Sequence, residues 1–146
     1  MATSPQTLQK KNKLVIVVSR GTVDGLYPPL ILATTAVAQG MDVHLYFTFG
    51  GMKLLTKSTA DALYVSKDLG LSKDQLQGLL AKGGMPTVRQ MLQGAREAGV
   101  KVHACSPTMN LFGASKQDLI PEHDDIIGAA TYLELASDPD AITLFV

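Results

Sequence analysis

The chain has 146 residues, of which 46% are hydrophobic and 18% are charged. This length and composition are typical of one globular domain with a substantial core, and they exclude an intrinsically disordered chain. Thirteen basic residues balance thirteen acidic ones, so no net charge favours nucleic acid or an anionic membrane as a partner.

Residues 1–12 are polar and lack the apolar stretch of a secretory signal, and no apolar run approaches the ~20 residues that span a bilayer. Cys105 is the single cysteine, so an internal disulfide is impossible and nothing indicates export. We expect a flexible N-terminus over residues 1–12, a single domain over residues 13–146, no membrane span and a cytoplasmic location.

The first predicted strand covers residues 14–19, an apolar run rich in β-branched residues that is typical of a parallel sheet covered on both faces. A glycine-containing loop follows. Residues 26–39 have helical length and many alanines and leucines, and Pro28 and Pro29 are expected in the first helical turn, where proline is tolerated.

A second strand is predicted over residues 42–49, and its alternation separates two faces. One face carries Val43, Leu45 and Phe47, and the other carries His44, Tyr46 and Thr48. Residues 53–84 have no clear period and are expected to form a covering flap or an oligomer contact. Within them, Ser72 is the predicted cap of a short helix over residues 72–81, with Leu76, Leu79 and Leu80 on one side.

The rest of the chain again alternates strands and helices. The predicted elements are a helix at 86–98, a strand at 100–104, a short helix at 109–112, a possible strand at 125–127, a helix at 128–136 and a strand at 141–146. This order predicts an open parallel α/β sheet, in which ligands bind beyond the carboxyl ends of the strands. Loops 19–24, 49–53 and 105–110 are expected to meet there.

Cys105 lies where the third strand should end, and Ser106 and Pro107 are typical of a helix start. Unpaired N–H groups and the helix dipole at such a junction favour the thiolate, the reactive form of cysteine. The alternative is a small buried residue without chemistry.

His103 shares the strand face of Cys105 and is a candidate base or proton partner, although such a histidine more often packs against a helix. Arg20 and the N–H groups after it are candidates to hold a small anion, or form an ordinary turn. His44 is expected to be structural. The histidines and the cysteine lack the spacing of a zinc site, so no metal is expected.

Several segments in this order resemble the DsrE/DsrF-like family of small sulfur-relay proteins. They are Leu-Val-Ile-Val-Val in the first strand, residues 24–32, Tyr-Phe-Thr-Phe-Gly-Gly after the second strand, residues 102–113 around Ala-Cys, Gly-Ala-Ala-Thr-Tyr-Leu at 128–133 and the Leu-Phe-Val terminus. The resemblance implies a three-layer α/β/α domain with a mainly parallel sheet of about five strands. It also implies homo-oligomers such as trimers, dimers or hexamers, and a cysteine that accepts and passes on sulfur.

Cys105 occupies the matching position, and the loop holds no second cysteine. The hypothesis is a cytoplasmic sulfur carrier or sulfurtransferase, a carrier rather than a multiple-turnover enzyme, that loads Cys105 with persulfide or thiosulfonate sulfur, without a cofactor, and exchanges it with another thiol protein of a sulfur relay. The candidate substrate-binding residues are Arg20, Gly50, Gly51, Ser106, Thr108, Met109 and Asn110. The alternatives are a thiol redox sensor and a non-catalytic oligomeric binding module.

Overall fold

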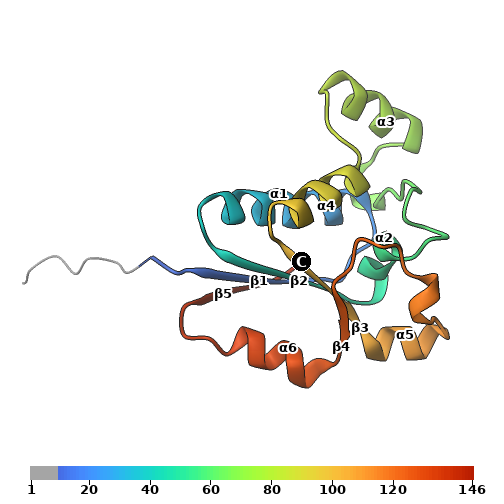
Figure 1. Cartoon of the computed structure of the whole chain (residues 1–146). Coiled ribbons are helices and arrows are strands. Elements are labelled where there is room, and N and C mark those ends of the chain that lie inside the picture. The colour runs from blue at the N-terminus through green and yellow to red at the C-terminus, as the bar shows by residue number, and fades with distance from the viewer. Residues whose placement is uncertain (1–9) are drawn as a thin grey trace, which may run out of the picture.

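A computed structural model, which describes residues 10–146, shows a five-stranded sheet of order β4-β3-β2-β1-β5 (Figure 1). Every neighbouring pair is parallel. The strands are β1 (Lys13–Val18), β2 (Asp42–Phe47), β3 (Lys101–Cys105), β4 (Asp125–Ile127) and β5 (Ala141–Phe145). The expected flexible N-terminus falls mostly on residues 1–9, outside the described residues, and stays a prediction.

Helices cover both faces of the sheet. They are α1 (Val23–Ala38), α2 (Met52–Leu55), α3 (Lys73–Lys82), α4 (Val88–Glu97), α5 (Ser106–Phe112) and α6 (Ala129–Ala136), with single 3-10 turns at Phe49–Gly51, Lys67–Leu69 and Lys116–Asp118. In Figure 1, α1 and α4 lie on one face, and α5 and α6 lie on the other. The predicted three-layer α/β/α fold is confirmed. No helix within residues 10–146 has both the length and the apolar composition needed to cross a membrane.

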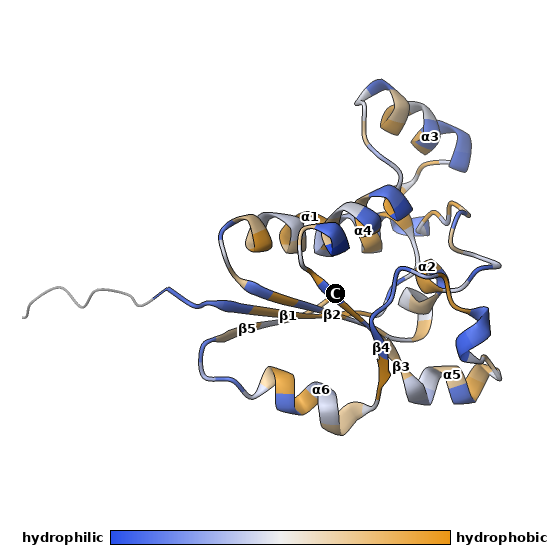
Figure 2. Cartoon of the chain, viewed as in Figure 1, coloured by the Kyte–Doolittle hydropathy of each residue, from blue (hydrophilic) through white to orange (hydrophobic). Residues whose placement is uncertain are grey.

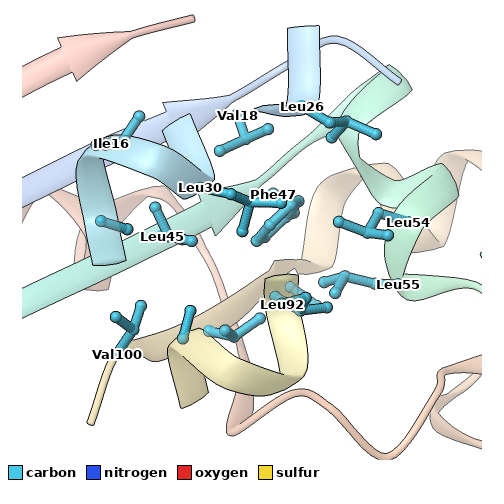
Figure 3. Close-up of a cluster of buried hydrophobic side chains, with 14 of the residues drawn as sticks. Ile16, Val18, Leu26, Leu30, Leu45, Phe47, Leu54, Leu55, Leu92 and Val100 are labelled. Carbon is cyan, nitrogen blue, oxygen red and sulfur yellow. The ribbon is translucent and has the colours of Figure 1, made fainter. Parts of the chain in front are cut away.

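The main core fills the space between the sheet and the helices α1, α2 and α4 (Figure 3). Ile16 and Val18 from β1 and Leu45 and Phe47 from β2 point into it, together with Leu92 from α4. The predicted face of Val43, Leu45 and Phe47 is therefore the core face. The opposite face of β2, with His44 and Tyr46, points toward α6 and carries the candidate site.

The helix α1 begins earlier than predicted. Because it starts at Val23, Pro28 and Pro29 lie inside the helix and not in its first turn. Proline has no N–H, so the carbonyls of Asp24 and Gly25 lack their usual helical donors at these two positions. The prediction for the prolines was wrong because the alanine and leucine pattern gives no signal for the first turn, residues 23–26.

Residues 53–84 divide into two parts that behave differently. Met52, Leu54 and Leu55 of α2 are buried in the main core. The helix α3 instead projects from the domain (Figure 1), and hydrophilic and hydrophobic residues alternate along it (Figure 2). Leu76 is buried but Leu79 is exposed, so the predicted common side of α3 is only partly covered.

Candidate active site at Cys105

Cys105 is the last residue of β3 and directly precedes α5. Pro107 lies in the first turn of α5, where its fixed φ suits the helix and its missing N–H is not needed. The Cys105 side chain packs on the α6 side of the sheet in a small cluster with Val17, Tyr46 and Ile127. The sequence therefore predicted the place of the cysteine, at the carboxyl end of a strand and the start of a helix.

The thiol is covered, although a thiol that exchanges sulfur with other molecules must be reached by them. Cys105 is 4% exposed in the single chain. The hydroxyl of Thr108, one turn along α5, donates a hydrogen bond to Cys105 Sγ at 3.2 Å. The same Thr108 Oγ1 lies 3.1 Å from Thr48 Oγ1 and accepts a hydrogen bond from the N–H of Phe49 at 3.1 Å. Thr108 thus ties the thiol to the end of β2.

The polar neighbours determine the acidity of the thiol. Burial raises the pKa of Cys105, but hydrogen bonds from the hydroxyls of Thr108, Thr48 and Tyr46 and from the Thr108 backbone bring the pKa below its ordinary value. Burial raises the pKa of Tyr46, and so does its hydrogen bond with the thiol. Tyr46 therefore keeps its proton and acts as a donor, and the site favours a thiolate at Cys105.

His103 belongs to a different set of contacts. Its Nε2 lies 2.9 Å from Nδ1 of His44, and its Nδ1 lies 2.5 Å from Oδ1 of Asp125. His44 Nε2 lies 3.0 Å from Oδ1 of Asp42. Both ring nitrogens of His103 are occupied in this way, so the ring does not bond the thiol of Cys105. His44, expected to be structural, is the partner of His103.

Proton counting shows what this row of two carboxylates and two imidazoles can hold. Its three contacts need three protons, whereas two neutral rings carry only two N–H groups. Burial lowers the pKa of His44, although Asp42 acts in the opposite direction. With both rings neutral, one of the three contacts therefore lacks a proton. A fourth proton would separate the rings, because both facing nitrogens would then be donors.

Loops 19–24, 49–53 and 105–110 were expected to meet at the sheet edge. Loop 49–53 contacts both of the others, but the side chain of Arg20 is not part of this contact. A Cβ on Gly50 would lie 2.9 Å from the carbonyl oxygen of Ser19, and a Cβ on Gly51 would lie 2.1 Å from that of Val18. The glycines therefore allow loop 49–53 to pack directly on the end of β1. Arg20 is paired with Asp24 at 3.0 Å and is turned to solvent, without a hydrogen bond to the cysteine loop.

The remaining candidate substrate-binding residues, on α5, differ in how far they are buried. Met109 is buried in the main core and Asn110 is exposed. The Ser106 hydroxyl lies beside Gly128 at the start of α6, 3.6 Å from where a Cβ would be. Among the predicted substrate-binding residues, Thr108 is thus the one whose side chain contacts the thiol.

A cavity of about 510 Å³ lies on the other side of Thr108. Its wall is formed by the segment 49–59 and by α5 with the turn that follows it. The lining residues are Phe49, Gly50, Met52, Lys53, Thr56, Lys57, Ser58, Thr59, Thr108, Met109, Phe112, Gly113, Ala114 and Asp118. Thr108 therefore separates the thiol from an open space.

Phe49 has an unusual backbone at this cavity. Its φ is 43°, in the left-handed region, and it is the single non-glycine residue with positive φ among residues 10–146. The side chain is 57% exposed and packs edge to face on Phe112, with ring centroids 6.1 Å apart. A bulky residue in this conformation is strained, and such strain is concentrated at functional sites.

Sequence reasoning did not select Thr48, Tyr46 or Phe49 as site residues. The alternation of β2 does place Tyr46 and Thr48 on the face that also carries His44. That signal becomes informative only when β2 is known to lie next to β3, which the strand order supplies.

Comparisons with known proteins identify relatives of this chain in sequence and in fold. The sequence matches the model of the DsrE/DsrF/DrsH-like family over residues 10–69 and 62–145. It is 31% identical to "Sulfur carrier protein DsrE2" of Allochromatium vinosum, over 90% of this chain and 96% of the relative. It is 26% identical to the uncharacterized protein YrkE of Bacillus subtilis, over 94% and 99% of the two chains.

Two solved structures share the fold. The ychN protein of E. coli superposes with a TM-score of 0.59 and 19% identity, over 92% of this chain and 99% of the other. MTH1491 of Methanobacterium thermoautotrophicum, described as a protein of unknown function, gives a TM-score of 0.58 and 11% identity, over 92% and 98%. At these identities the likeness establishes the α/β fold alone.

Proposed function

The chain belongs to the DsrE/DsrF/DrsH-like family, and we propose that it is a sulfur carrier that holds sulfur on Cys105. The observation that carries the proposal is the environment of the one thiol in the chain. The Thr108 hydroxyl donates to Cys105 Sγ, and together with the hydroxyls of Thr48 and Tyr46 it lowers the pKa of the thiol. A relative that is 31% identical is itself named a sulfur carrier protein.

The loading step needs a thiolate and a leaving group. The Cys105 thiolate attacks the outer sulfur of a persulfide, a new S–S bond forms at Cys105, and the donor leaves as a thiolate with the electron pair of its broken S–S bond. With tetrathionate the thiolate attacks an inner sulfur, thiosulfate leaves, and a thiosulfonate group stays on Cys105. Both products are anions, and the hydroxyls of Thr108, Thr48 and Tyr46 are suitable donors for them.

Transfer to an acceptor is the reverse attack, by a thiolate of a partner on the outer sulfur of the loaded Cys105. The single cysteine makes an internal disulfide impossible, so sulfur must leave to another molecule. We propose a thiol protein of a sulfur relay as that partner, a cytoplasmic location, and a homo-oligomer as the working form. The protein acts in this scheme as a carrier and not as a multiple-turnover enzyme.

The burial of the thiol favours a second candidate function. If Cys105 stays covered, it is an inert core residue and the chain is a non-catalytic binding module. The carrier requires that the contact of Thr108 and Phe49 over the thiol opens in solution. The strained φ of Phe49 supports an opening at that point, because leaving the left-handed region releases backbone strain.

Mass spectrometry separates these functions. Intact protein is incubated with tetrathionate, with inorganic polysulfide, with peroxide or with iodoacetamide, and peptides are mapped. Sulfur or thiosulfonate adducts on Cys105 support the carrier, and oxygen adducts alone support a redox sensor. Absence of every adduct at neutral pH supports the binding module. Cys105→Ser is expected to remove all loading with an unchanged circular dichroism spectrum, and persistent loading of this variant would exclude Cys105 as the carrier.

A further inference from the structure

The cavity beside Thr108 has no role in the scheme above. We propose that it binds a low-molecular-weight organic persulfide that carries a carboxylate, and that this molecule is a direct sulfur donor to Cys105. The inference rests on the proposed function, because it names the donor for the same thiol.

The size and lining of the cavity fit a small organic molecule. Its volume of about 510 Å³ lies within the range of ~300–1,000 Å³ that is usual for small-ligand sites. Met52, Met109, Phe49 and Phe112 supply apolar walls, and Thr56 and Thr59 supply hydroxyls. Inorganic polysulfide has no apolar body to use these walls, and the cysteine side chain of a protein donor would fill a small part of the space.

The charges on the wall favour an anion. Lys53 and Lys57 both line the cavity. The Lys53 ammonium lies 4.2 Å from the ring centroid of Tyr64, which positions it. Asp118, the acidic residue in the lining, already accepts hydrogen bonds from the N–H and hydroxyl of Ser115. The lining therefore carries two lysines and one carboxylate, and this excess of positive charge complements a carboxylate on the ligand.

Thr108 connects the cavity to the thiol. It lines the cavity, and its hydroxyl donates to Cys105 Sγ at 3.2 Å. Phe49 lies at the same wall and donates its N–H to Thr108 Oγ1. When Phe49 leaves its left-handed conformation, that hydrogen bond breaks and Thr108 can turn, which brings the outer sulfur of a bound persulfide to Sγ.

The step is balanced without an oxidant or a reductant. The Cys105 thiolate attacks the outer sulfur of R–S–SH, the new S–S bond forms at Cys105, and R–S⁻ leaves with the electron pair of the broken S–S bond. The proton stays on the transferred sulfur. The released thiolate R–S⁻ keeps the same body and carboxylate, so it competes with the persulfide for the cavity.

The experiment compares two donors on two cavity variants. Glutathione persulfide is the organic probe, and inorganic polysulfide is the probe that lacks an apolar body to bind the cavity walls. Ser58→Trp fills the cavity from an exposed turn, and Lys57→Glu reverses the charge of its wall. Lys82→Glu, on the projecting α3, makes the same charge change outside the cavity and is the matched control. Circular dichroism verifies that each variant is folded, and loading of Cys105 is followed by mass spectrometry.

For each cavity variant we expect loading from glutathione persulfide to slow by about tenfold. Lys57→Glu removes one charge-assisted contact with the ligand, and Ser58→Trp removes the volume that the ligand would occupy. Loading from polysulfide should slow less than loading from glutathione persulfide, and every rate of Lys82→Glu should stay at the wild-type value. If the cavity variants leave both donors at wild-type rates, or slow both equally, the cavity proposal is refuted while Cys105 remains the carrier. If neither donor loads wild-type Cys105, the proposed function itself fails.

Discussion

Replacing Thr108 by valine tests the physical origin of the lowered pKa of Cys105. Valine keeps the shape of threonine and removes the hydroxyl that donates to Cys105 Sγ at 3.2 Å. The hydrogen bond favours the thiolate over the thiol, because a donor interacts more strongly with an anion. Thr108→Val should therefore raise the pKa of Cys105 and reduce the thiolate population at neutral pH.

The magnitude follows from the remaining donors. A hydrogen bond to a charged group contributes about 1.5–3 kcal/mol. Because the hydroxyls of Thr48 and Tyr46 remain, the loss should be at the low end, about 1.5 kcal/mol, which lowers the thiolate fraction about tenfold at any pH below the pKa. The variant also leaves the Phe49 N–H without its acceptor, so some loss of stability accompanies the change.

The assay is the ultraviolet absorbance of the thiolate as a function of pH, with the Cys105→Ser protein as the baseline for tyrosine absorbance. The chain has one cysteine, so the difference signal belongs to one group. Thr35→Val is the matched control, because the Thr35 hydroxyl bonds only the carbonyl of Ile31 within α1 among the described residues. Superimposable titrations of Thr108→Val and the wild type, with both proteins folded, would refute the hydrogen-bond explanation.

Three further predictions concern stability, measured as urea midpoints. Leu92→Ala should lower the free energy of unfolding by about 2–5 kcal/mol, since Leu92 is fully buried in the main core. A loss of less than about 1 kcal/mol would show that α4 packs differently. Burial lowers the pKa of His44, so this histidine binds a proton more readily in the unfolded chain, and the stability of the wild type should fall as pH drops below ~6.5. His44→Gln should reduce this loss of stability, and an equal pH dependence in both proteins would contradict the explanation. Burial raises the pKa of Asp124, but Arg96 and the Val102 N–H bring this pKa below its ordinary value. The contribution of Asp124 to stability should therefore be present above ~pH 3.9 and lost at lower pH. Asp124→Asn should be less stable than the wild type at pH 7 and should not show this loss in acid.

The strands were predictable because each is a short apolar run between turn residues. The predicted strand at 14–19 is displaced from β1 by one residue at each end, and the predicted strand at 141–146 is one residue longer than β5. The helix α4 was predicted equally well from its spaced apolar residues. The start of α1 was predicted less well, because Val23 to Gly25 were assigned to the preceding glycine-containing loop.

Within residues 53–84, the predicted helix at 72–81 is confirmed as α3, but residues 53–71 could not be assigned from their sequence. Leu54 and Leu55 are buried by contacts with elements that are distant in sequence, which no local period encodes. The helix α3 depends on its capping box, in which Ser72 and Gln75 bond each other's backbone, more than on burial. The cavity was missed for the same reason, since residues 49–59 meet α5 only in the folded chain.

The acidity of Cys105 shows where sequence reasoning reached the right result through a secondary cause. Position alone predicted a low pKa, from the N–H groups and dipole at the start of a helix. In the structure, burial opposes the thiolate, and the hydroxyls of Thr108, Thr48 and Tyr46 outweigh the one backbone contribution, from Thr108. Tyr46 lies near the end of β2 and Thr48 directly follows that strand, and β2 pairs with β3 in the sheet. The lowered pKa of the thiol is therefore a product of strand order as much as of the Cys-Ser-Pro junction.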